Sequence, residues 1–341
     1  MRNLYPPQFS GVAVCRCECC CGAALRIHRR VRDVHFGTPG EWDYEACTNC
    51  GFARIYPMPT EDELAAFYSS YYPRCEKPRT FKRSGYRSFL KRAVLSGAYG
   101  YSAESTVEKW VGHILARCAP LRERIGMQIM FLGGESPGKL LDVGCGVGFF
   151  LVIMRELGWD VLGVEADFKT ANIARQEFGL PVIAGSLRDA MLPDESIDVI
   201  TMGHVIEHIS HPEAVLREAL RILKPGGRIV ILTPNVRSLG HRIFGASWQH
   251  LSPPYHVQLF SLQGLLFMLK QVGFEPKEAR TSARCARQTW MESVKSRRAQ
   301  GYRARHIVDA LNSLLFAAVE TAACMVAPNS GEELVFEGIK A

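Results

Sequence analysis

The chain has 341 residues, an apolar fraction of 47% and a formal net charge of +7. These values are ordinary for a soluble globular protein, and they allow one large domain or two smaller ones. The charge hints at an anionic partner or substrate without requiring nucleic acid. The sequence lacks a signal peptide and the ~18 uninterrupted apolar residues of a membrane span, so we expect a cytoplasmic protein.

Seven of the twelve cysteines lie between residues 15 and 50. In a reducing compartment, such a cluster indicates metal ligands rather than disulfides. Two C-x-x-C turns can place four thiolates tetrahedrally around a structural Zn²⁺, and the favoured ligands are Cys17, Cys20, Cys47 and Cys50. The competitors for the first pair are Cys15, Cys19 and Cys21. A metal-free knuckle is the alternative.

Thr60, with Glu63 three residues later, predicts the start of a helix through a capping box. The C-x-x-C-G of residues 47–51, the P-x-P-T of residues 57–60 and the aromatic residues 68–72 follow one another closely. This succession resembles the zinc-ribbon leader found ahead of certain bacterial class I methyltransferases. We therefore expect a zinc-ribbon-like leader over residues 1–60, with a strand near 41–46, and a helical connector over residues 61–138.

Residues 74–92 carry eight basic side chains with three aromatic residues interleaved. A solvated linker or helix face is the commoner explanation of such a stretch. The sharper hypothesis is a surface for a phosphate-bearing substrate or for anionic lipid headgroups.

Residues 139–150, KLLDVGCGVGFF, predict a buried strand, a glycine-rich turn and the start of a helix. The turn has glycine at alternate positions, which are Gly144, Gly146 and Gly148. Backbone N–H groups can approach a ligand closely there. A dinucleotide fingerprint would need glycine at position 149, which is Phe149. Asp142, at the strand end, would repel a pyrophosphate but suits a ligand with an ammonium and a sulfonium group.

Glu165 ends a second apolar strand, residues 159–165. A carboxylate at that place accepts hydrogen bonds from ribose hydroxyls. The D-x-G-x-G-x-G of residues 142–148, followed by G-V-E at residues 163–165, resembles the class I S-adenosylmethionine-dependent methyltransferases. The resemblance covers at least residues 139–276. It implies an α/β fold with a doubly wound, Rossmann-like, mostly parallel sheet, and S-adenosyl-L-methionine (SAM) as the cofactor.

The elements expected after Glu165 are helices at 168–178 and 212–223, and strands at 181–184, 197–202 and 228–233. Residues 224–227, KPGG, predict a turn before the last of these strands.

The resemblance also implies cofactor contacts. The adenine would lie against Ser186 and Leu187, although many relatives have an acid where Ser186 stands. The methionyl part would lie against the end of the first strand and the glycine turn, at Asp142, Gly144, Cys145, Gly146 and Gly148. It would also lie against His204, which follows the fourth strand.

Residues 204–208, HVIEH, read alone, match the inverted zinc-protease pattern. That pattern requires a long helix, whereas this segment follows a strand, so we disfavour a peptidase. The segment resembles that of the ubiquinone-pathway O-methyltransferases. By analogy, His208 could remove a proton from the methyl acceptor. The alternative is a histidine that satisfies backbone groups at a strand end.

Residues 248–260 resemble the substrate-side loop of the same bacterial subgroup, so His250 and His256 are candidate acceptor contacts or a base, with loop packing as the alternative. The SPPY at residues 252–255 mimics a signature of amino-methyltransferases. That signature belongs after the fourth strand, and this copy follows the fifth.

Residues 139–341 are expected to form the methyltransferase domain, with a helical insertion at 283–330. A lid or dimer face is a better explanation of the insertion than membrane contact. Residues 332–339 predict the last, antiparallel strand.

The sequence thus predicts methyl transfer from SAM to an oxygen or carbon of a small-molecule, sugar or lipid-precursor acceptor. One rival is an RNA base methyltransferase that binds RNA through the ribbon and residues 74–92. Another is a non-enzymatic SAM-binding scaffold. Peripheral membrane contact and the oligomeric state stay open.

Overall fold

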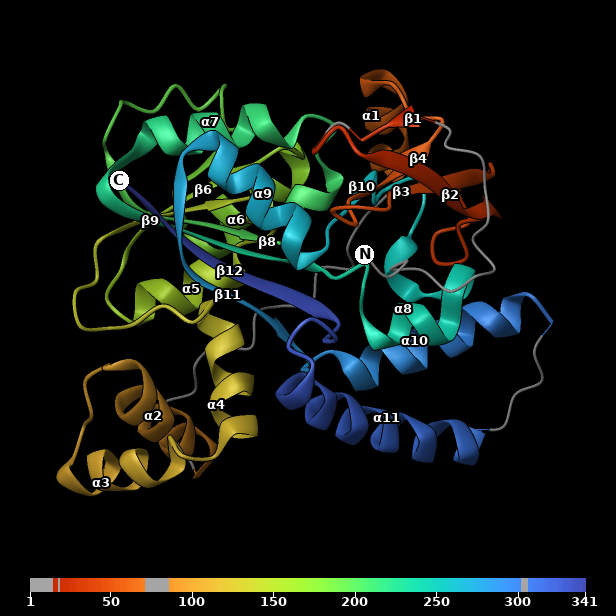
Figure 1. Cartoon of the computed structure of the whole chain (residues 1–341). Coiled ribbons are helices and arrows are strands. Elements are labelled where there is room, and N and C mark those ends of the chain that lie inside the picture. The colour runs from red at the N-terminus through yellow and green to blue at the C-terminus, as the bar shows by residue number, and fades with distance from the viewer. Residues whose placement is uncertain (1–14, 18, 71–85, 302–305) are drawn as a thin grey trace. The chain divides into compact units, whose positions relative to one another are not determined.

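The computed structural model describes residues 15–17, 19–70, 86–301 and 306–341 (Figure 1). Residues 71–85 lie outside the described residues. They carry most of the basic stretch and Cys75. The chain divides into two compact units, each assembled from segments far apart in the sequence. Unit 1 comprises Met1–Pro73, His204–Glu213 and Ile231–Glu337. Unit 2 comprises Arg74–Gly203, Ala214–Val230 and Gly338–Ala341.

Parallel strands form the centre of unit 2. They are β5 (Lys139–Val143), β6 (Asp160–Glu165), β7 (Val182–Ala184) and β8 (Ile197–Gly203). β5 pairs with β6 and with β8, and β6 pairs with β7. Parallel neighbours need crossover connections, which here contain the helices α5 (Phe149–Glu156) and α6 (Phe168–Phe178). α6 begins at its cap Asp167, whose carboxylate accepts the Thr170 N–H at 2.8 Å.

Three further strands complete a seven-stranded sheet: β9 (Leu223–Pro234), β11 (Phe274–Ser282) and β12 (Glu333–Lys340). The strand order is β11-β12-β9-β8-β5-β6-β7. The expected Rossmann-like, mostly parallel α/β sheet is confirmed.

The turn expected at residues 224–227 forms the first part of β9 instead, because the strand begins directly after α7 (Pro212–Ile222). Gly227 approaches the backbone of β8 there: a Cβ at this position would lie 3.2 Å from the Asp198 carbonyl oxygen.

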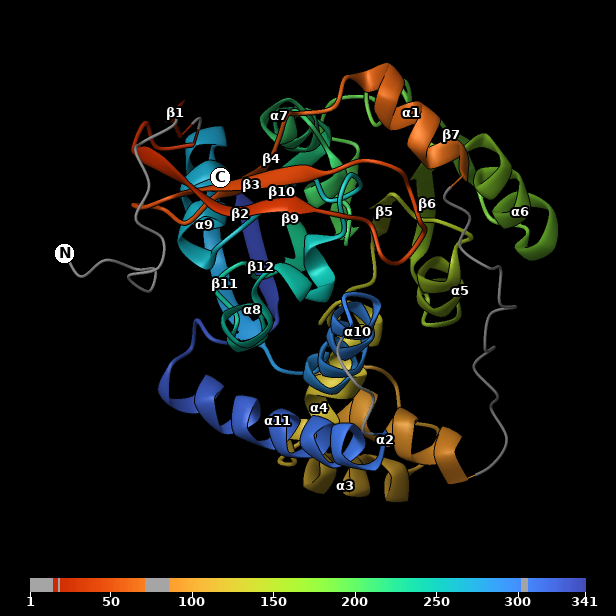
Figure 2. The same ribbon diagram turned by 90° about the vertical axis from the view of Figure 1, so that its right-hand side faces the viewer.

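Three helices of unit 2 lie within residues 61–138, where a helical connector was expected. They are α2 (Tyr86–Tyr99), α3 (Thr106–Leu115) and α4 (Ala119–Gly126), with a short 3₁₀ turn, η1 (Met127–Ile129). α2 and α3 lie side by side in both views (Figures 1 and 2).

Unit 1 contains a second sheet, with the order β1-β2-β3-β4-β10 and antiparallel pairing throughout (Figure 2). Its strands are β1 (Cys15–Arg16), β2 (Ala23–Val31), β3 (Trp42–Cys47), β4 (Ala53–Tyr56) and β10 (Gln258–Leu259). The last strand comes from the second half of the chain. Tyr44 of β3 and Trp248 are fully buried in one shared core. The N-terminal strands and residues 236–259 therefore fold around the same apolar side chains.

The helices of unit 1 are α1 (Glu61–Ser70), α8 (Leu239–Phe244), α9 (Leu262–Val272), α10 (Ala286–Ala299) and α11 (His306–Val326). The capping box expected at α1 is confirmed, since the Thr60 N–H donates to Glu63 at 2.8 Å and the Glu63 N–H donates to Thr60 Oγ1 at 3.3 Å. α10 and α11, which lie within the predicted insertion at residues 283–330, pack along each other (Figure 1). Within the described part of the chain, no helix combines the length and apolarity that crossing a bilayer requires.

Candidate functional site

The glycine turn after β5 has left-handed backbone conformations. The φ angles of Gly144, Gly146 and Gly148 are 69°, 56° and 87°. At two of these positions, glycine is needed for different reasons. A Cβ on Gly148 would lie 2.2 Å from Leu180 Cδ1, so packing excludes a side chain there. A Cβ on Gly146 would have no atom within 4 Å, so this backbone faces open space that a ligand can occupy.

Glu165, half-buried at the end of β6, is tied to this turn. One carboxylate oxygen accepts the Gly146 N–H at 2.8 Å, and the other accepts the Asp167 N–H at 2.9 Å. Each oxygen keeps a second lone pair, so the carboxylate can still accept hydrogen bonds from hydroxyl groups.

Asp142 lies at the end of β5 with 5% of its surface exposed. Its Oδ1 accepts a hydrogen bond from Thr201 Oγ1 at 2.7 Å. Burial raises the pKa of this carboxyl to about 7, a shift that the Thr201 hydrogen bond opposes and the charge of Glu165 increases. A positively charged ligand would favour the ionised form of Asp142.

The remaining expected cofactor contacts of unit 2 differ in accessibility. Leu187 and Cys145 are buried, whereas Ser186 is exposed. The Ser186 hydroxyl donates to Asp189 Oδ2 at 2.7 Å, and the Asp189 N–H donates back to Ser186 Oγ at 3.3 Å. The acid of this segment is Asp189, three residues after Ser186. The S-x-x-D capping pattern was the sequence signal for it.

His204 belongs to unit 1 and has a left-handed φ of 56°. Its Nδ1 lies 3.3 Å from Glu207 Oε1, and its Nε2 lies 3.0 Å from Glu333 Oε1. Burial of nitrogen atoms disfavours protonation, but the two carboxylates outweigh that effect and raise the pKa of His204. Glu333 is a partner that sequence reasoning missed, because it lies on β12, 129 residues later.

His208 and His256 lie together in unit 1, with ring centroids 4.7 Å apart in an edge-to-face arrangement. His208 Nδ1 lies 3.0 Å from the Tyr255 carbonyl oxygen and 2.8 Å from the Tyr68 hydroxyl. His256 Nδ1 lies 2.7 Å from the His250 carbonyl oxygen. Tyr68, from α1, is a second contact that the sequence analysis did not assign to a site.

Both imidazoles are neutral near pH 7. Burial lowers the pKa of His208, although the charge of Glu207 opposes the shift. Burial and the neighbouring His208 lower the pKa of His256 to about 3. The long helix that the inverted zinc-protease pattern requires is absent from this described segment, since residues Ile206–His208 form a single 3₁₀ turn, η2.

His250 is buried, with its Nε2 3.2 Å from the Thr289 hydroxyl of α10. Burial lowers its pKa to about 4. These contacts lie within the protein interior, as the loop-packing interpretation expects.

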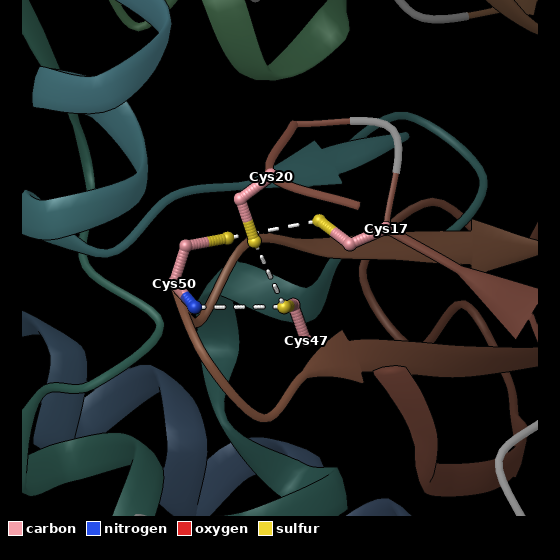
Figure 3. Close-up of side chains that lie close together, drawn as sticks. All are labelled: Cys17, Cys20, Cys47 and Cys50. Atoms are coloured by element: carbon pink, nitrogen blue, oxygen red, sulfur yellow. Dashed lines mark hydrogen bonds between the residues drawn. The ribbon is translucent and has the colours of Figure 1, made fainter. Parts of the chain in front are cut away.

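Four cysteine side chains converge between β1–β2 and the turn after β3 (Figure 3). The Sγ atoms of Cys17 and Cys50 are 3.6 Å apart, and those of Cys20 and Cys47 are 3.5 Å apart. A tetrahedral Zn²⁺ with four thiolates separates its sulfur atoms by about 3.8 Å, so this set fits the ion closely. Cys19 donates to the Gly264 carbonyl oxygen instead, and Cys21 is exposed. The side chain of Cys15 lies outside the described residues.

Residues 112–279 match the model of a family described as a methyltransferase domain. A malonyl-[acyl-carrier protein] O-methyltransferase from Serratia marcescens is 31% identical over 144 residues, which cover 42% of this chain and 56% of that protein. A ubiquinone biosynthesis O-methyltransferase from Maricaulis maris is 35% identical over 128 residues, which cover 34% of this chain and 50% of that protein. The chain thus spans about half the length of these curated relatives. The solved structure of a SAM-dependent methyltransferase from Archaeoglobus fulgidus covers 66% of this chain and 94% of its own, at 19% identity and a TM-score of 0.45.

Proposed function

Because residues 112–279 belong to the methyltransferase-domain family, we propose that this protein transfers a methyl group from SAM to a small-molecule acceptor. The relatives described above are named as O-methyltransferases, which supports a hydroxyl oxygen as the methyl acceptor. A carbon acceptor, or an acceptor that is a sugar or lipid precursor, is a finer form of the same proposal. Neither of these two relatives is named for RNA methylation, so they favour a small-molecule acceptor over RNA.

The observation that carries the proposal is the set of groups around Gly146. The turn offers an unobstructed backbone position, and two carboxyl groups, of Asp142 and Glu165, lie next to it. When bound, SAM supplies an electrophilic methyl group on a positively charged sulfur. Asp142 would favour the positive methionyl part, and Glu165 would accept hydrogen bonds from the ribose hydroxyls.

The other contacts are assigned by the resemblance. Ser186 and Leu187 would lie against the adenine, with Cys145 and the glycines of the turn against the methionyl part. His204, whose two ring nitrogens lie against carboxylates, is a further contact that the resemblance assigns to the methionyl part.

We assign the removal of the acceptor's proton to the pair His208 and His256. Each ring has Nδ1 against a backbone carbonyl oxygen, which orients the ring and leaves Nε2 as the atom that can accept a proton. Proton removal makes a hydroxyl oxygen a better nucleophile toward the methyl group.

We also propose that Cys17, Cys20, Cys47 and Cys50 bind one structural Zn²⁺, because four converging thiolates leave no open coordination position for a substrate. The ion would join β1–β2 to the turn after β3.

Calorimetric titration with SAM tests the cofactor site. In Glu165→Ala, we expect the affinity for SAM to fall by at least about tenfold, because the ribose acceptor is lost and Gly146 loses its partner. Glu165→Gln keeps the side-chain volume and one acceptor oxygen, so its affinity for SAM should lie between those of Glu165→Ala and the wild type. Unchanged affinity in Glu165→Ala would contradict the site. Formation of S-adenosylhomocysteine with a panel of hydroxylated small molecules would then identify the acceptor class.

A further inference from the structure

Three side chains of unit 1 bring potential metal ligands together, away from the four cysteines. Glu207, His208 and His256 each offer one ligand atom, and these atoms all lie within 4.8 Å of one another. The first two come from the turn η2, and the third comes from the loop before β10. We propose that these three side chains bind one divalent transition-metal ion.

The tautomers of both histidines suit this role. A carbonyl oxygen can only accept a hydrogen bond, so the nitrogen that contacts it must carry the proton. Nδ1 of His208 lies 3.0 Å from the Tyr255 carbonyl oxygen, and Nδ1 of His256 lies 2.7 Å from the His250 carbonyl oxygen. In each neutral ring, Nε2 therefore carries a lone pair. Metal-ligating histidines commonly donate their other ring N–H to a backbone carbonyl in this way.

Glu207 supplies an oxygen that lacks a donor. Its side chain is fully buried, and its Oε2 accepts a hydrogen bond from Thr233 Oγ1 at 2.9 Å. Among the described residues, none donates to Oε1 with hydrogen-bond geometry, although His204 Nδ1 lies 3.3 Å from it. The ion pair with His204 leaves this buried oxygen without a well-aligned hydrogen bond, and coordination of a cation would supply one more partner.

The ligand types define the class of ion. Two imidazole nitrogens and one carboxylate oxygen suit Zn²⁺, Co²⁺, Mn²⁺ or Fe²⁺, whereas Mg²⁺ and Ca²⁺ prefer oxygen ligands. Three protein ligands leave at least one position open, unlike the closed four-cysteine set. A bound cation would lower the pKa of a hydroxyl group that contacts it, and the proton would then pass to water, because the ion would hold both Nε2 lone pairs; in the ion-free protein those lone pairs are the base. That use rests on the proposed function, whereas binding of the ion does not.

Addition of Co²⁺ to protein that carries one zinc ion per chain, at the four cysteines, tests the inference directly. We expect metal analysis to find one Co²⁺ per chain in addition to zinc. The visible spectrum should show the d–d bands of a nitrogen and oxygen site, without the charge-transfer absorption of cobalt bound to thiolates. An absence of uptake beyond the zinc site would overturn the proposal. Uptake with thiolate charge transfer alone would also overturn it, because the ion would then have replaced zinc at the cysteines.

Variants locate the ion. Glu207→Gln removes the charge at constant volume, and His256→Ala removes one nitrogen ligand. Each should weaken Co²⁺ binding by at least about tenfold. His113→Ala, at an exposed position on α3, is the matched control and should bind Co²⁺ like the wild type. Wild-type affinity in both site variants would refute the assignment.

Two measurements guard against misfolded variants. Co²⁺ should raise the melting temperature of the wild-type protein and of His113→Ala, but not that of the site variants. X-ray absorption by Co²⁺ in the wild-type protein should show two imidazole ligands, and an oxygen-only shell would overturn the proposal without any variant. Neither measurement uses SAM or an acceptor, so the ion site and the methyltransferase proposal can fail separately.

Discussion

The glycine turn of unit 2 and the histidine cluster of unit 1 are assembled in opposite ways. Residues 142–165 form the turn and its partner Glu165 within one strand–helix–strand segment, mainly through backbone conformation and backbone hydrogen bonds. The cluster joins Tyr68, His208, His256 and, through His204, Glu333, which lie on four separate elements. A site made by neighbouring residues leaves a readable pattern in the sequence, whereas a site made by distant side chains leaves only single residues.

The four-cysteine site combines both kinds of assembly, with two pairs of near neighbours brought together from distant parts of the chain. We expect its loss to have the largest effect on stability. We expect about one zinc ion per chain in the purified protein, with removal by a chelator or in Cys47→Ser destabilising the β1–β4 sheet by about 5 kcal/mol or more. Because β10 pairs with β4, methylation should fall as well. Metal analysis and thermal melting check this expectation. A zinc-free sample that melts like the original would count against the site.

Removing one histidine separates the two regions functionally. We expect His208→Ala to lower kcat/KM for methylation by at least about 100-fold, because the pair that removes the acceptor's proton is lost. Affinity for SAM should stay unchanged, since the glycine turn is untouched. Initial rates and SAM calorimetry measure both quantities. Methylation at the wild-type rate would remove His208 from the mechanism.

Two glycine variants separate packing from ligand access inside the turn. Gly148→Ala would place a Cβ 2.2 Å from Leu180, so we expect a stability loss of about 3 kcal/mol. The Cβ of Gly146→Ala would have no atom within 4 Å. The loss of stability should therefore be about 1 kcal/mol, from the positive φ alone. SAM affinity, by contrast, should fall about tenfold in Gly146→Ala, because the methyl group fills the space left for the ligand. Equal effects of the two variants on both properties would refute this division.

A buried acid outside both regions should give an effect on stability that depends on pH. Glu320 of α11 is fully buried, and burial together with the charge of Glu332 raises its pKa to about 9 from a usual value of 4.5. The folded protein keeps this proton while the unfolded chain loses it above pH 4.5, so this contribution to stability is lost as the pH rises toward 9. Glu320→Gln should therefore stabilise the protein by about 2 kcal/mol at pH 8 and change little at pH 4. Melting curves at both pH values provide the comparison, and a gain that is equal at both would exclude titration as its cause.

The sequence predicted the parts of the fold that local patterns determine. The bounds of β5, β6 and α6 match the expected elements within one residue, because apolar runs, glycines and the cap Asp167 specify them. The two C-x-x-C pairs identified the cysteines that converge. The pairing of β10 with β4 was not foreseen, because two residues of strand carry no pattern of their own. Glu333 and Tyr68 escaped prediction for a related reason, since only tertiary packing brings them to the histidines.

The contact of β4 with the loop before β10 joins the N-terminal strands to the loop that we propose contacts the acceptor. The Ile55 N–H donates to the Val257 carbonyl oxygen at 3.0 Å, and the Tyr44 hydroxyl donates to the His256 carbonyl oxygen at 3.1 Å. A chimera that takes its first 60 residues from a relative would need residues 248–260 from the same parent. In evolution, the two segments should consequently be exchanged as a pair.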